Sequence, residues 1–268
     1  MSPILFHIYG PISIHSFGAM IVFGAVITLY LLHRDQPLHT FISDDQLATI
    51  VQISFFSGMI GGRCWFLITN QSMILSWTDV IAVWSGGLSI LGAIIATIIA
   101  LSVYFYNQNL PALPILDRLA LYAPLLQSIS RFGCFFAGCC YGQTTNLPWS
   151  IIYKHPDSLA PLHIALHPTQ IYSSLFLLSS FIILLCFDRY YRNQKPGQII
   201  ALYLILISLE RFFVDFFRGD QEFLTSCNLC TNLSIQQILA LCLCITGLII
   251  MIFVTLYKNK AKVYNSNK

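Results

Sequence analysis

Long apolar segments alternate with short polar segments along almost the whole chain. Seven segments of roughly 20 mainly apolar residues have the length that an α-helix needs to cross the hydrocarbon core of a bilayer. They lie at about 12–32, 47–69, 80–106, 119–136, 170–187, 198–217 and 235–257. Residues that favour turns or break helices, among them Pro37, Pro111 and the pair Pro196-Gly197, separate these segments. The pattern predicts an all-α polytopic membrane protein, a bundle of seven transmembrane helices.

The composition supports a membrane protein and excludes several other classes. Hydrophobic residues make up 56% of the chain and charged residues only 9%, which is too little polar surface for a soluble globule of 268 residues. The net charge of +3 is small and spread out, so we expect no nucleic acid partner. The first apolar segment lacks the features of a cleavable signal peptide, and no internal repeat stands out. We therefore expect a single integral membrane domain over residues 1–268.

The distribution of lysine and arginine predicts how the helices cross the membrane. An external N-terminus and a cytoplasmic C-terminus place most basic residues on the cytoplasmic side, as the positive-inside rule requires. These residues are Arg34, Arg118, Arg189, Arg192, Lys195, Lys258, Lys260, Lys262 and Lys268. The same orientation predicts a basic cytoplasmic tail over residues 258–268 and an external arm or loop region over residues 137–169. Connections of that length in a compact bundle are usually lids, arms or binding elements.

Four arginines remain within or at the ends of the predicted helices, and they are the first candidates for a functional site. The four are Arg63, Arg131, Arg211 and Arg218. All of them fall in the outer halves of their segments, so we expect them to share one cavity, because separately solvating each charge is costly. Arg211, Asp215 and Arg218 lie on one helix face, where the carboxylate neutralises part of the charge. Guanidinium groups suit a phospholipid phosphate, while anchoring at the headgroup level is the alternative.

Residues 130–142 combine arginine, glycine and cysteine at the end of the fourth apolar segment. The glycines are Gly133, Gly138 and Gly142, and the cysteines are Cys134, Cys139 and Cys140. The glycines let the backbone leave the helix or let a ligand approach closely, and a tight contact between helices is the alternative. Together with the external pair Cys227 and Cys230, the cysteines leave open a thiol-disulfide relay or a thiolate metal site. We expect Cys227 and Cys230 to form a disulfide on the oxidising side.

Further motifs fall at the same predicted depth. His15 precedes most of the first apolar segment, although a histidine at a helix entry more often caps or packs. Trp84-Ser85-Gly86-Gly87-Leu88-Ser89 lies in the outer part of the third segment, and His167-Pro168-Thr169-Gln170-Ile171-Tyr172 begins the fifth. Three other motifs belong to the same ordered set along the chain. They are Gly61-Gly62-Arg63, Arg131-Phe132-Gly133 with Gly138 and Gly142, and Arg211-Phe212 with Asp215 and Arg218.

This ordered set resembles the bacterial phosphatidylglycerol-prolipoprotein diacylglyceryl transferases, and the resemblance extends from His15 to Arg218. It implies a seven-helix enzyme of the bacterial cytoplasmic (inner) membrane that carries out the first step of lipoprotein maturation. The N-terminus and the arm over residues 137–169 would then lie in the periplasm. Such enzymes move the diacylglyceryl group of phosphatidylglycerol to the lipobox cysteine thiol of a prolipoprotein signal peptide and release glycerol 1-phosphate. The implied partners are phosphatidylglycerol, the signal peptide and membrane lipids, and no cofactor or metal ion is expected.

The resemblance also implies roles for individual residues. Catalytic roles fall on Arg131, Arg211, Asp215, His15 and His167. Phosphatidylglycerol binding falls on Arg131, Arg63, Arg211, Arg218, Gly86, Gly87, Ser89, Gly133, Gly138, Gly142, Gln170 and Tyr172. Residues 130–142 correspond to the signature sequence of the family. This signature departs from the family at Cys134, Ala137 and Cys139, which replace two asparagines and a glutamate. Outside it, Asp215 stands where glutamate is usual.

Other departures from the family affect which residue can act as the general base, the group that takes the proton from the acceptor thiol. Leu91 stands where the family often has histidine or tyrosine, Phe17 where tyrosine is common, and Ser173 where glutamate usually follows the histidine-proline motif. Because the acceptor peptide of this family brings its own thiol, we expect Cys134 and Cys139 to pack in a rearranged pocket wall. Two alternatives to the transferase function stay open. One is a membrane thiol-disulfide oxidoreductase that uses Cys134, Cys139, Cys140, Cys227 and Cys230. The other is a non-catalytic phospholipid-binding paralogue.

Overall fold

The protein divides into two compact units. The structure, a computed structural model, describes residues 4–9, 12–70, 87–191, 195–221 and 233–266. The first unit combines Met1–Arg34 with Leu116–Lys268, and the second is Asp35–Ile115. We describe each unit by itself, and a single domain over residues 1–268 stays a prediction.

Seven helices of 18 residues or more account for most of the described chain, and each overlaps one predicted apolar segment. They are α1 Ser16–His33, α3 Asp44–Thr69, α5 Ile90–Asn107, α6 Ala112–Ala137, α7 Thr169–Tyr190, α8 Gln198–Asp215 and α9 Ile235–Ser266. Five of them, α1, α3, α5, α7 and α9, are long and apolar enough to cross a membrane. The mostly helical polytopic membrane protein is thus confirmed, while the count of seven spans and the orientation stay predictions.

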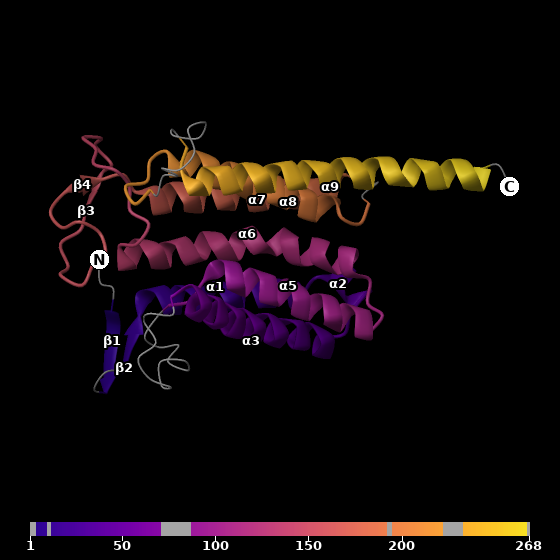
Figure 1. Ribbon diagram of the computed structural model, residues 1–268, viewed down its shortest axis with the longest axis horizontal. Helices are drawn as coiled ribbons and strands as arrows, with labels where there is room; N and C mark the ends of the chain where they lie inside the picture. Colours follow the sequence, from indigo (N-terminus) through magenta and orange to yellow (C-terminus); the bar gives the residue numbers. More distant parts are fainter. Residues whose placement is uncertain (1–3, 10–11, 71–86, 192–194, 222–232, 267–268) are drawn as a thin grey trace. The chain divides into compact units, whose positions relative to one another are not determined.

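Two helices begin later than the apolar pattern predicts. Residues Ile12–His15 form strand β2, which pairs antiparallel with β1, Ile4–Tyr9, so α1 starts at Ser16 (Figure 1). In the third segment α5 starts at Ile90, because Ser89 is extended and acts as the N-cap residue. Residues 80–86 of that predicted helix lie outside the described residues. Apolar runs locate membrane helices well, but they do not distinguish a helix from an extended entry segment.

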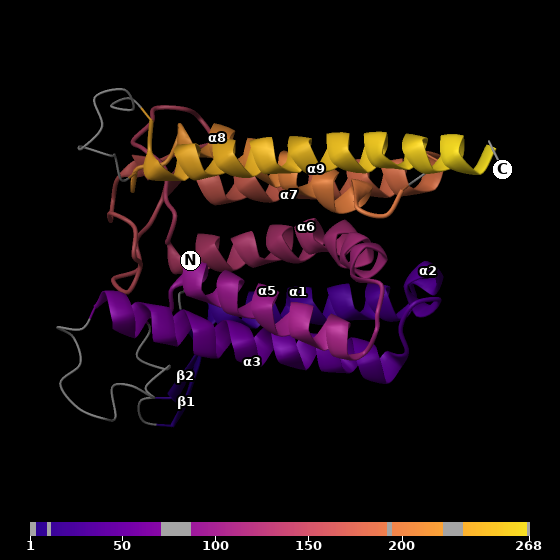
Figure 2. The ribbon, with the colours of Figure 1, turned by 45° about the vertical axis from the view of Figure 1, so that its right-hand side comes forward.

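In the first unit, α7, α8 and α9 lie side by side (Figures 1 and 2). Leu121 of α6, Leu184 of α7 and Ile199 of α8 form a buried apolar cluster. Near one end of these helices, the Asp117 carboxylate accepts hydrogen bonds from the backbone N–H groups of Gly197 and Ile200 at 2.6 and 2.8 Å. Asp117 therefore satisfies unpaired donors at the start of α8 and ties α8 to α6.

The arm between α6 and α7 packs against the opposite end of α6. Strands β3, Ile151–Ile152, and β4, Ala165–Leu166, pair antiparallel within it. Tyr153, Ala160 and Leu166 form a small buried cluster, and the Tyr153 hydroxyl donates to the Phe135 carbonyl at 3.2 Å. Burial raises the pKa of the Tyr153 phenol, so it stays a neutral donor. The predicted arm is a folded element with its own core.

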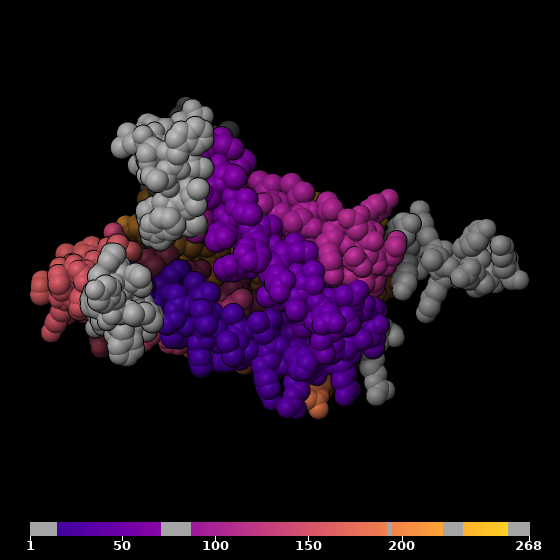
Figure 3. Space-filling model, turned by 90° about the horizontal axis from the view of Figure 1, so that it is seen from below, coloured from indigo at the N-terminus to yellow at the C-terminus, as the bar shows by residue number. Residues whose placement is uncertain are grey.

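The second unit consists of the short helix α2, Gln36–His39, with α3 and α5. The two long helices approach each other closely through small residues. A Cβ atom on Gly61 would lie 2.6 Å from the Gly92 carbonyl oxygen and closer still to Ala96. Figure 3 shows one face of the space-filling structure, with α3 and α5 in violet to magenta. Apolar side chains of α3 such as Phe55 and Ile60 are exposed. Exposed apolar side chains suit lipid contact.

Candidate active site

Three segments that are distant in sequence meet at the arm end of the first unit. The Gln143 N–H donates to the Phe217 carbonyl at 2.8 Å, and the Gly219 N–H donates to the Tyr141 carbonyl at 3.0 Å. On the other side, the His167 N–H donates to the Gln143 carbonyl at 2.9 Å. The backbone after α6 is therefore held between the end of α8 and the approach to α7.

The first residues of α7 fix the cysteine-containing turn. The Thr169 hydroxyl donates to the Cys140 carbonyl at 2.7 Å, and the Gln170 amide donates to the Cys139 carbonyl at 2.8 Å. Both donor side chains belong to residues that are 1% exposed. Buried backbone carbonyls outside a helix need hydrogen-bond donors. Thr169 and Gln170 of the histidine-proline motif are those donors, so the motif holds the turn at Cys139 and Cys140 in place.

Three of the four predicted arginines line one small polar pocket. Its lining consists of Arg131, Arg211, Arg218, Cys140, Thr169, Gln170, Ser173 and Val214. The arginines come from α6, from α8 and from the segment after α8. Gathering three guanidinium groups costs free energy through mutual repulsion, which a bound anion relieves.

The three arginines differ in their local partners. Arg218 makes two hydrogen bonds to Asp220, at 2.8 and 2.7 Å, and its Nε lies 4.0 Å from Asp215. Arg131 lies 3.8 Å from Glu210, whose carboxylate also accepts a hydrogen bond from Ser173. For Arg211 we find no carboxylate oxygen within 4 Å in the described part of the chain. Arg211 is therefore the guanidinium best placed to pair with a ligand.

A larger apolar pocket of about 840 Å³ adjoins the polar one, and Val214 lines both. The remaining lining residues are Leu147, Trp149, His167, Tyr172, Phe176, Phe213 and Phe217. The Tyr172 hydroxyl accepts a hydrogen bond from the Trp149 indole at 2.8 Å and lies 3.3 Å from Nδ1 of His167. A cationic pocket beside an apolar one suits a molecule with a phosphate headgroup and a hydrocarbon part.

Comparison with known sequences assigns this site to a family. The sequence model described as "Prolipoprotein diacylglyceryl transferase" matches residues 3–253. The chain belongs to the prolipoprotein diacylglyceryl transferase family. A relative from Clostridium tetani, named phosphatidylglycerol--prolipoprotein diacylglyceryl transferase, is 33% identical over 220 residues, which cover 82% of this chain and 86% of the relative.

Two further relatives carry the same name. One from Clostridium perfringens, numbered 2, is 32% identical over 82% of this chain and 84% of its own length. One from Lactococcus lactis subsp. lactis is 29% identical over 93% of this chain and 94% of its own length. The resemblance stated from the motifs is confirmed, and the chain is an enzyme of the diacylglyceryl transferase family. Nothing in the comparisons supports the thiol-disulfide oxidoreductase alternative.

Several residues that the resemblance selected have clear contacts within the second unit of this diacylglyceryl transferase. Arg63 belongs to the second unit, where its guanidinium donates to the Gly87 carbonyl at 3.1 Å and stacks over Phe66. In the same unit, the Ser89 N–H donates to the Gly62 carbonyl at 3.0 Å. Gly86 lies outside the described residues. These contacts give Arg63 a role in holding the segment before α5.

In the first unit, His15, Gly133 and Asp215 lie outside the pocket lining. His15 is exposed and lines a groove on α1, and Gly133 packs against the backbone of Phe17. Asp215 is buried and accepts a hydrogen bond from the Ser234 hydroxyl, so it supports the end of α8. Their proposed roles in the diacylglyceryl transferase reaction stay predictions.

Sequence reasoning missed the serines that hold the two buried carboxylates. Ser173 bonds Glu210 from α7, and Ser234 bonds Asp215 from the turn before α9. Ser173 stands where the family usually has glutamate, so the departure noted in the sequence places a hydroxyl donor beside the Glu210 carboxylate. The replacement of glutamate by serine was the one sign in the sequence that Ser173 has a carboxylate partner. A serine can hydrogen-bond to a buried carboxylate, whereas a second carboxylate would repel it.

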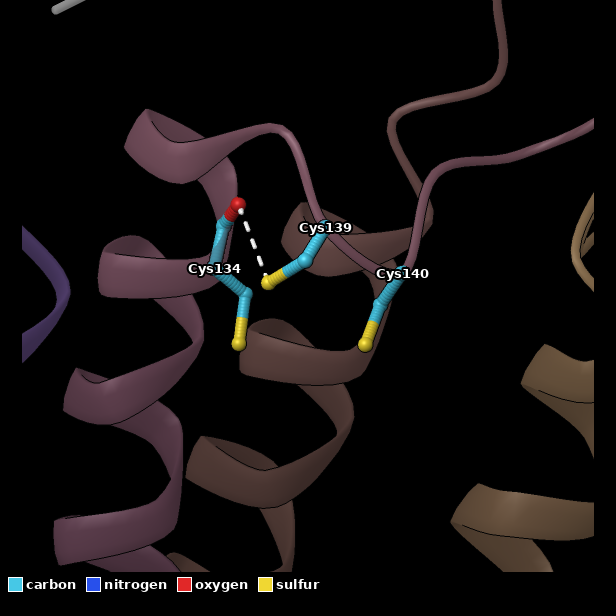
Figure 4. A group of neighbouring side chains, drawn as sticks. All are labelled: Cys134, Cys139 and Cys140. Atoms are coloured by element: carbon cyan, nitrogen blue, oxygen red, sulfur yellow. Dashed lines mark hydrogen bonds between the residues drawn. The ribbon is translucent and has the colours of Figure 1, made fainter. Parts of the chain in front are cut away.

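The three cysteines of the signature lie together as free thiols. Their sulfur atoms all lie within 4.8 Å of one another (Figure 4). The Cys139 thiol donates a long hydrogen bond to the Cys134 carbonyl, at 3.8 Å. Hydrogen bonds from Cys134 and Cys139, together with the charges of Arg218 and Arg131, lower the pKa of the Cys140 thiol. Cys227 and Cys230 lie outside the described residues, so their disulfide stays a prediction.

Proposed function

We propose that this family member transfers the diacylglyceryl group of phosphatidylglycerol to the lipobox cysteine thiol of a prolipoprotein signal peptide. A thioether forms, and glycerol 1-phosphate leaves. Family membership supports the reaction class, and the observation that carries the proposal is the junction of the two pockets at Val214. The substrate needs such a junction, because the bond that breaks joins its phosphate to its hydrophobic part.

The phosphate of phosphatidylglycerol is assigned to Arg211 and Arg131. Arg211 meets no carboxylate among the described residues, and Arg131 has only a partner at 3.8 Å, so both can turn toward an anion. The Oε1 atom of Gln170 is buried without a hydrogen-bond partner among the described residues. A hydroxyl of the glycerol headgroup would satisfy that acceptor, which would otherwise carry a desolvation penalty.

The hydrophobic part of the lipid is assigned to the apolar pocket. Its aromatic walls accept the glyceryl esters and the first part of the acyl chains, and His167 and Tyr172 face the same space. In the transfer, the acceptor sulfur attacks the glyceryl carbon that carries the phosphate oxygen. The carbon–oxygen bond breaks, and the departing phosphate monoester keeps the electron pair. The arginines stabilise the charge that develops on it.

The base is assigned to His167. Leu91 carries no proton, whereas His167 lines the apolar pocket and is oriented by the Tyr172 hydroxyl at 3.3 Å. Arg218 is bound to Asp220 on two atoms, so its role is to hold the pocket wall and add positive potential. The catalytic role of His15 and the binding role of Arg63 rest on the resemblance alone.

The proposed topology has seven spans in the bacterial inner membrane, with the N-terminus and the arm in the periplasm. The distribution of basic residues supports the orientation. In the first unit, the arm lies at one end of the helices and the C-terminus of α9 at the other (Figure 1). The polar pocket at the arm end therefore opens on the periplasmic side, where prolipoproteins emerge.

Substitution of the arginines tests the proposal. Arg211→Ala and Arg131→Ala should lower transfer from phosphatidylglycerol to a lipobox peptide by about 10²–10³-fold, the usual loss when one charge-stabilising donor is removed. Arg211→Lys and Arg131→Lys should recover little, since an ammonium group does not reproduce two parallel hydrogen bonds. Arg189→Ala, an exposed residue near the end of α7, is the matched control and should transfer normally.

The readout is thioether product from detergent-solubilised protein, beside complementation of a strain that lacks its own transferase. Activity near wild type in Arg211→Lys would contradict the phosphate role. Tight phosphatidylglycerol binding by the wild-type chain without any turnover would instead favour the non-catalytic paralogue.

A further inference from the structure

The three thiols of the signature have the geometry of a metal site. Cys134 comes from the last turn of α6, and Cys139 and Cys140 come from the turn that follows, so that the three side chains are neighbours (Figure 4). Three sulfur atoms around a zinc ion at about 2.3 Å lie about 3.8 Å from one another in tetrahedral geometry. Their mutual separations here, all within 4.8 Å, allow that arrangement after small side-chain rotations.

The backbone around the thiols is held in an uncommon conformation. Cys140 has a φ of 56°, in the left-handed region that residues with a side chain rarely adopt, and Gly138 has a φ of 76°. The hydrogen bonds from Thr169 and Gln170 to the carbonyls of Cys140 and Cys139 fix this turn. Strain that is held by several contacts is typical of functional sites, and hydrogen bonds behind the ligands are typical of metal centres.

The donor set selects the kind of ion. Thiolates are soft ligands that favour zinc over calcium or magnesium, which prefer oxygen. Among the residues that the structure describes, no fourth cysteine, histidine, aspartate or glutamate joins the group. Three protein ligands with an open fourth position distinguish a catalytic zinc site from a structural one, which is closed.

The surrounding charges favour a zinc–thiolate centre. Three thiolates and one zinc ion carry a net charge of −1. Arg131 precedes Cys134 by one helical turn, and Cys140 lines the polar pocket together with Arg131 and Arg218. The positive charges offset the negative centre, and the ion would lie at the wall of the pocket assigned to the phosphate.

We propose that Cys134, Cys139 and Cys140 bind one Zn²⁺ ion whose fourth ligand is the acceptor cysteine thiol of the prolipoprotein. This inference rests on the proposed transferase function. Coordination makes the thiol more acidic, and His167, the base assigned above, accepts its proton. The zinc-bound sulfur then forms the bond to the glyceryl carbon, the carbon–oxygen bond to phosphate breaks, and glycerol 1-phosphate leaves with the electron pair. The neutral thioether binds zinc weakly and departs.

The proposal explains two departures of this chain from its family together. The signature loses two asparagines and a glutamate where cysteines and an alanine stand, and Leu91 removes a group that could accept a proton. A zinc-bound thiol gives up its proton to a base as weak as a histidine, so zinc would compensate for the group that is missing at Leu91.

Metal content is the first test. The intact chain, purified in detergent after growth with zinc, should hold about one zinc ion per molecule. Cys134→Ser and Cys139→Ser should reduce zinc at least about tenfold, in line with the effect of disturbing a metal's ligand shell. Cys186→Ser on α7 and Cys242→Ser on α9, both exposed thiols outside the cluster, are the matched controls and should keep the ion. A metal-free wild-type protein would overturn the proposal.

Cobalt tests the fourth ligand without depending on turnover or on a variant that folds. Co²⁺ exchanged into the wild-type chain should show sulfur-to-cobalt charge-transfer absorption. A lipobox peptide should increase that absorption, whereas the same peptide with its cysteine changed to serine should not. Binding of both peptides with no spectral difference would overturn the role of the acceptor thiol. So would loss of zinc in the Cys227→Ser, Cys230→Ser double variant, because the fourth ligand would then belong to the chain.

Activity separates this proposal from the transferase function itself. Removal of zinc by a chelator should abolish thioether formation, and added zinc should restore it. Transfer that continues in metal-free protein would overturn the zinc site and leave the transferase function standing. Zinc binding and the thiol-specific cobalt response without transfer under any condition would overturn the transferase function instead.

Discussion

There is no room for a side chain at Gly142, because its backbone lies against His167, the residue assigned as the base. A Cβ atom there would lie 2.5 Å from both Cβ and the carbonyl oxygen of His167. Gly142→Ala should therefore displace His167, destabilise the protein by about 1–3 kcal/mol as overpacking usually does, and lower transfer. Gly18→Ala in α1 is the matched control, because a Cβ atom there meets nothing within 4 Å. Thermal unfolding in detergent and a transfer assay measure both effects, and equal behaviour of the two variants would contradict this contact.

For individual residues, the sequence indicated which arginines belong to the candidate site but not which side chains pair with the buried charges. Arg131 and Arg211 could be selected because a charge in an apolar segment is costly and needs a reason. The partners could not be selected in the same way. Ser234 resembles many other serines in the chain, and Ser173 differs only in standing where the family usually has glutamate. Both reach the carboxylates of Asp215 and Glu210 only through helix packing. The pairing belongs to tertiary structure, which no spacing along one helix encodes.

The pair of α3 and α5 depends on the absence of side chains at their contact. Gly61→Ala should force the two helices apart, since its Cβ atom would meet Gly92 and Ala96, and should cost about 1–3 kcal/mol. Gly58→Ala, one turn earlier on α3, would meet only Thr97 Oγ1 at an ordinary 3.5 Å and should be tolerated. Thermal unfolding of both variants in the same detergent makes the comparison. Equal midpoints would show that α3 and α5 are held together by other contacts.

Helices as elements were largely predictable, and their entry segments were not. A run of about 20 apolar residues has few alternatives in a membrane protein, so every long helix was expected near its observed place. The hairpin of β1 and β2 and the short strands of the arm carry no comparable signal. Two-residue strands have no measurable period, and β2 continues directly into the apolar run of α1.

On the scale of the whole molecule, the proposed topology predicts which lysines meet the periplasm. A membrane-impermeant amine reagent should label Lys154, which is exposed in the arm, in cells whose outer barrier has been opened. Lys260 in the basic tail should be labelled only after the inner membrane is permeabilised. Peptide mass spectrometry reads both sites in the same sample. Equal labelling of Lys260 before and after permeabilisation would contradict the proposed orientation.

The polar residues of α8 also bear on how the chain enters the bilayer during synthesis. Glu210, Arg211 and Asp215 lie in its last two turns, and a charge at the centre of a membrane helix costs about 2.5–3.5 kcal/mol on insertion. Ser173, the partner of Glu210, precedes α8, whereas Ser234, the partner of Asp215, immediately precedes α9. We therefore expect α8 to wait beside the insertion machinery until α9 has been made. The residues assigned to catalysis would then make the last two helices enter the membrane as one unit.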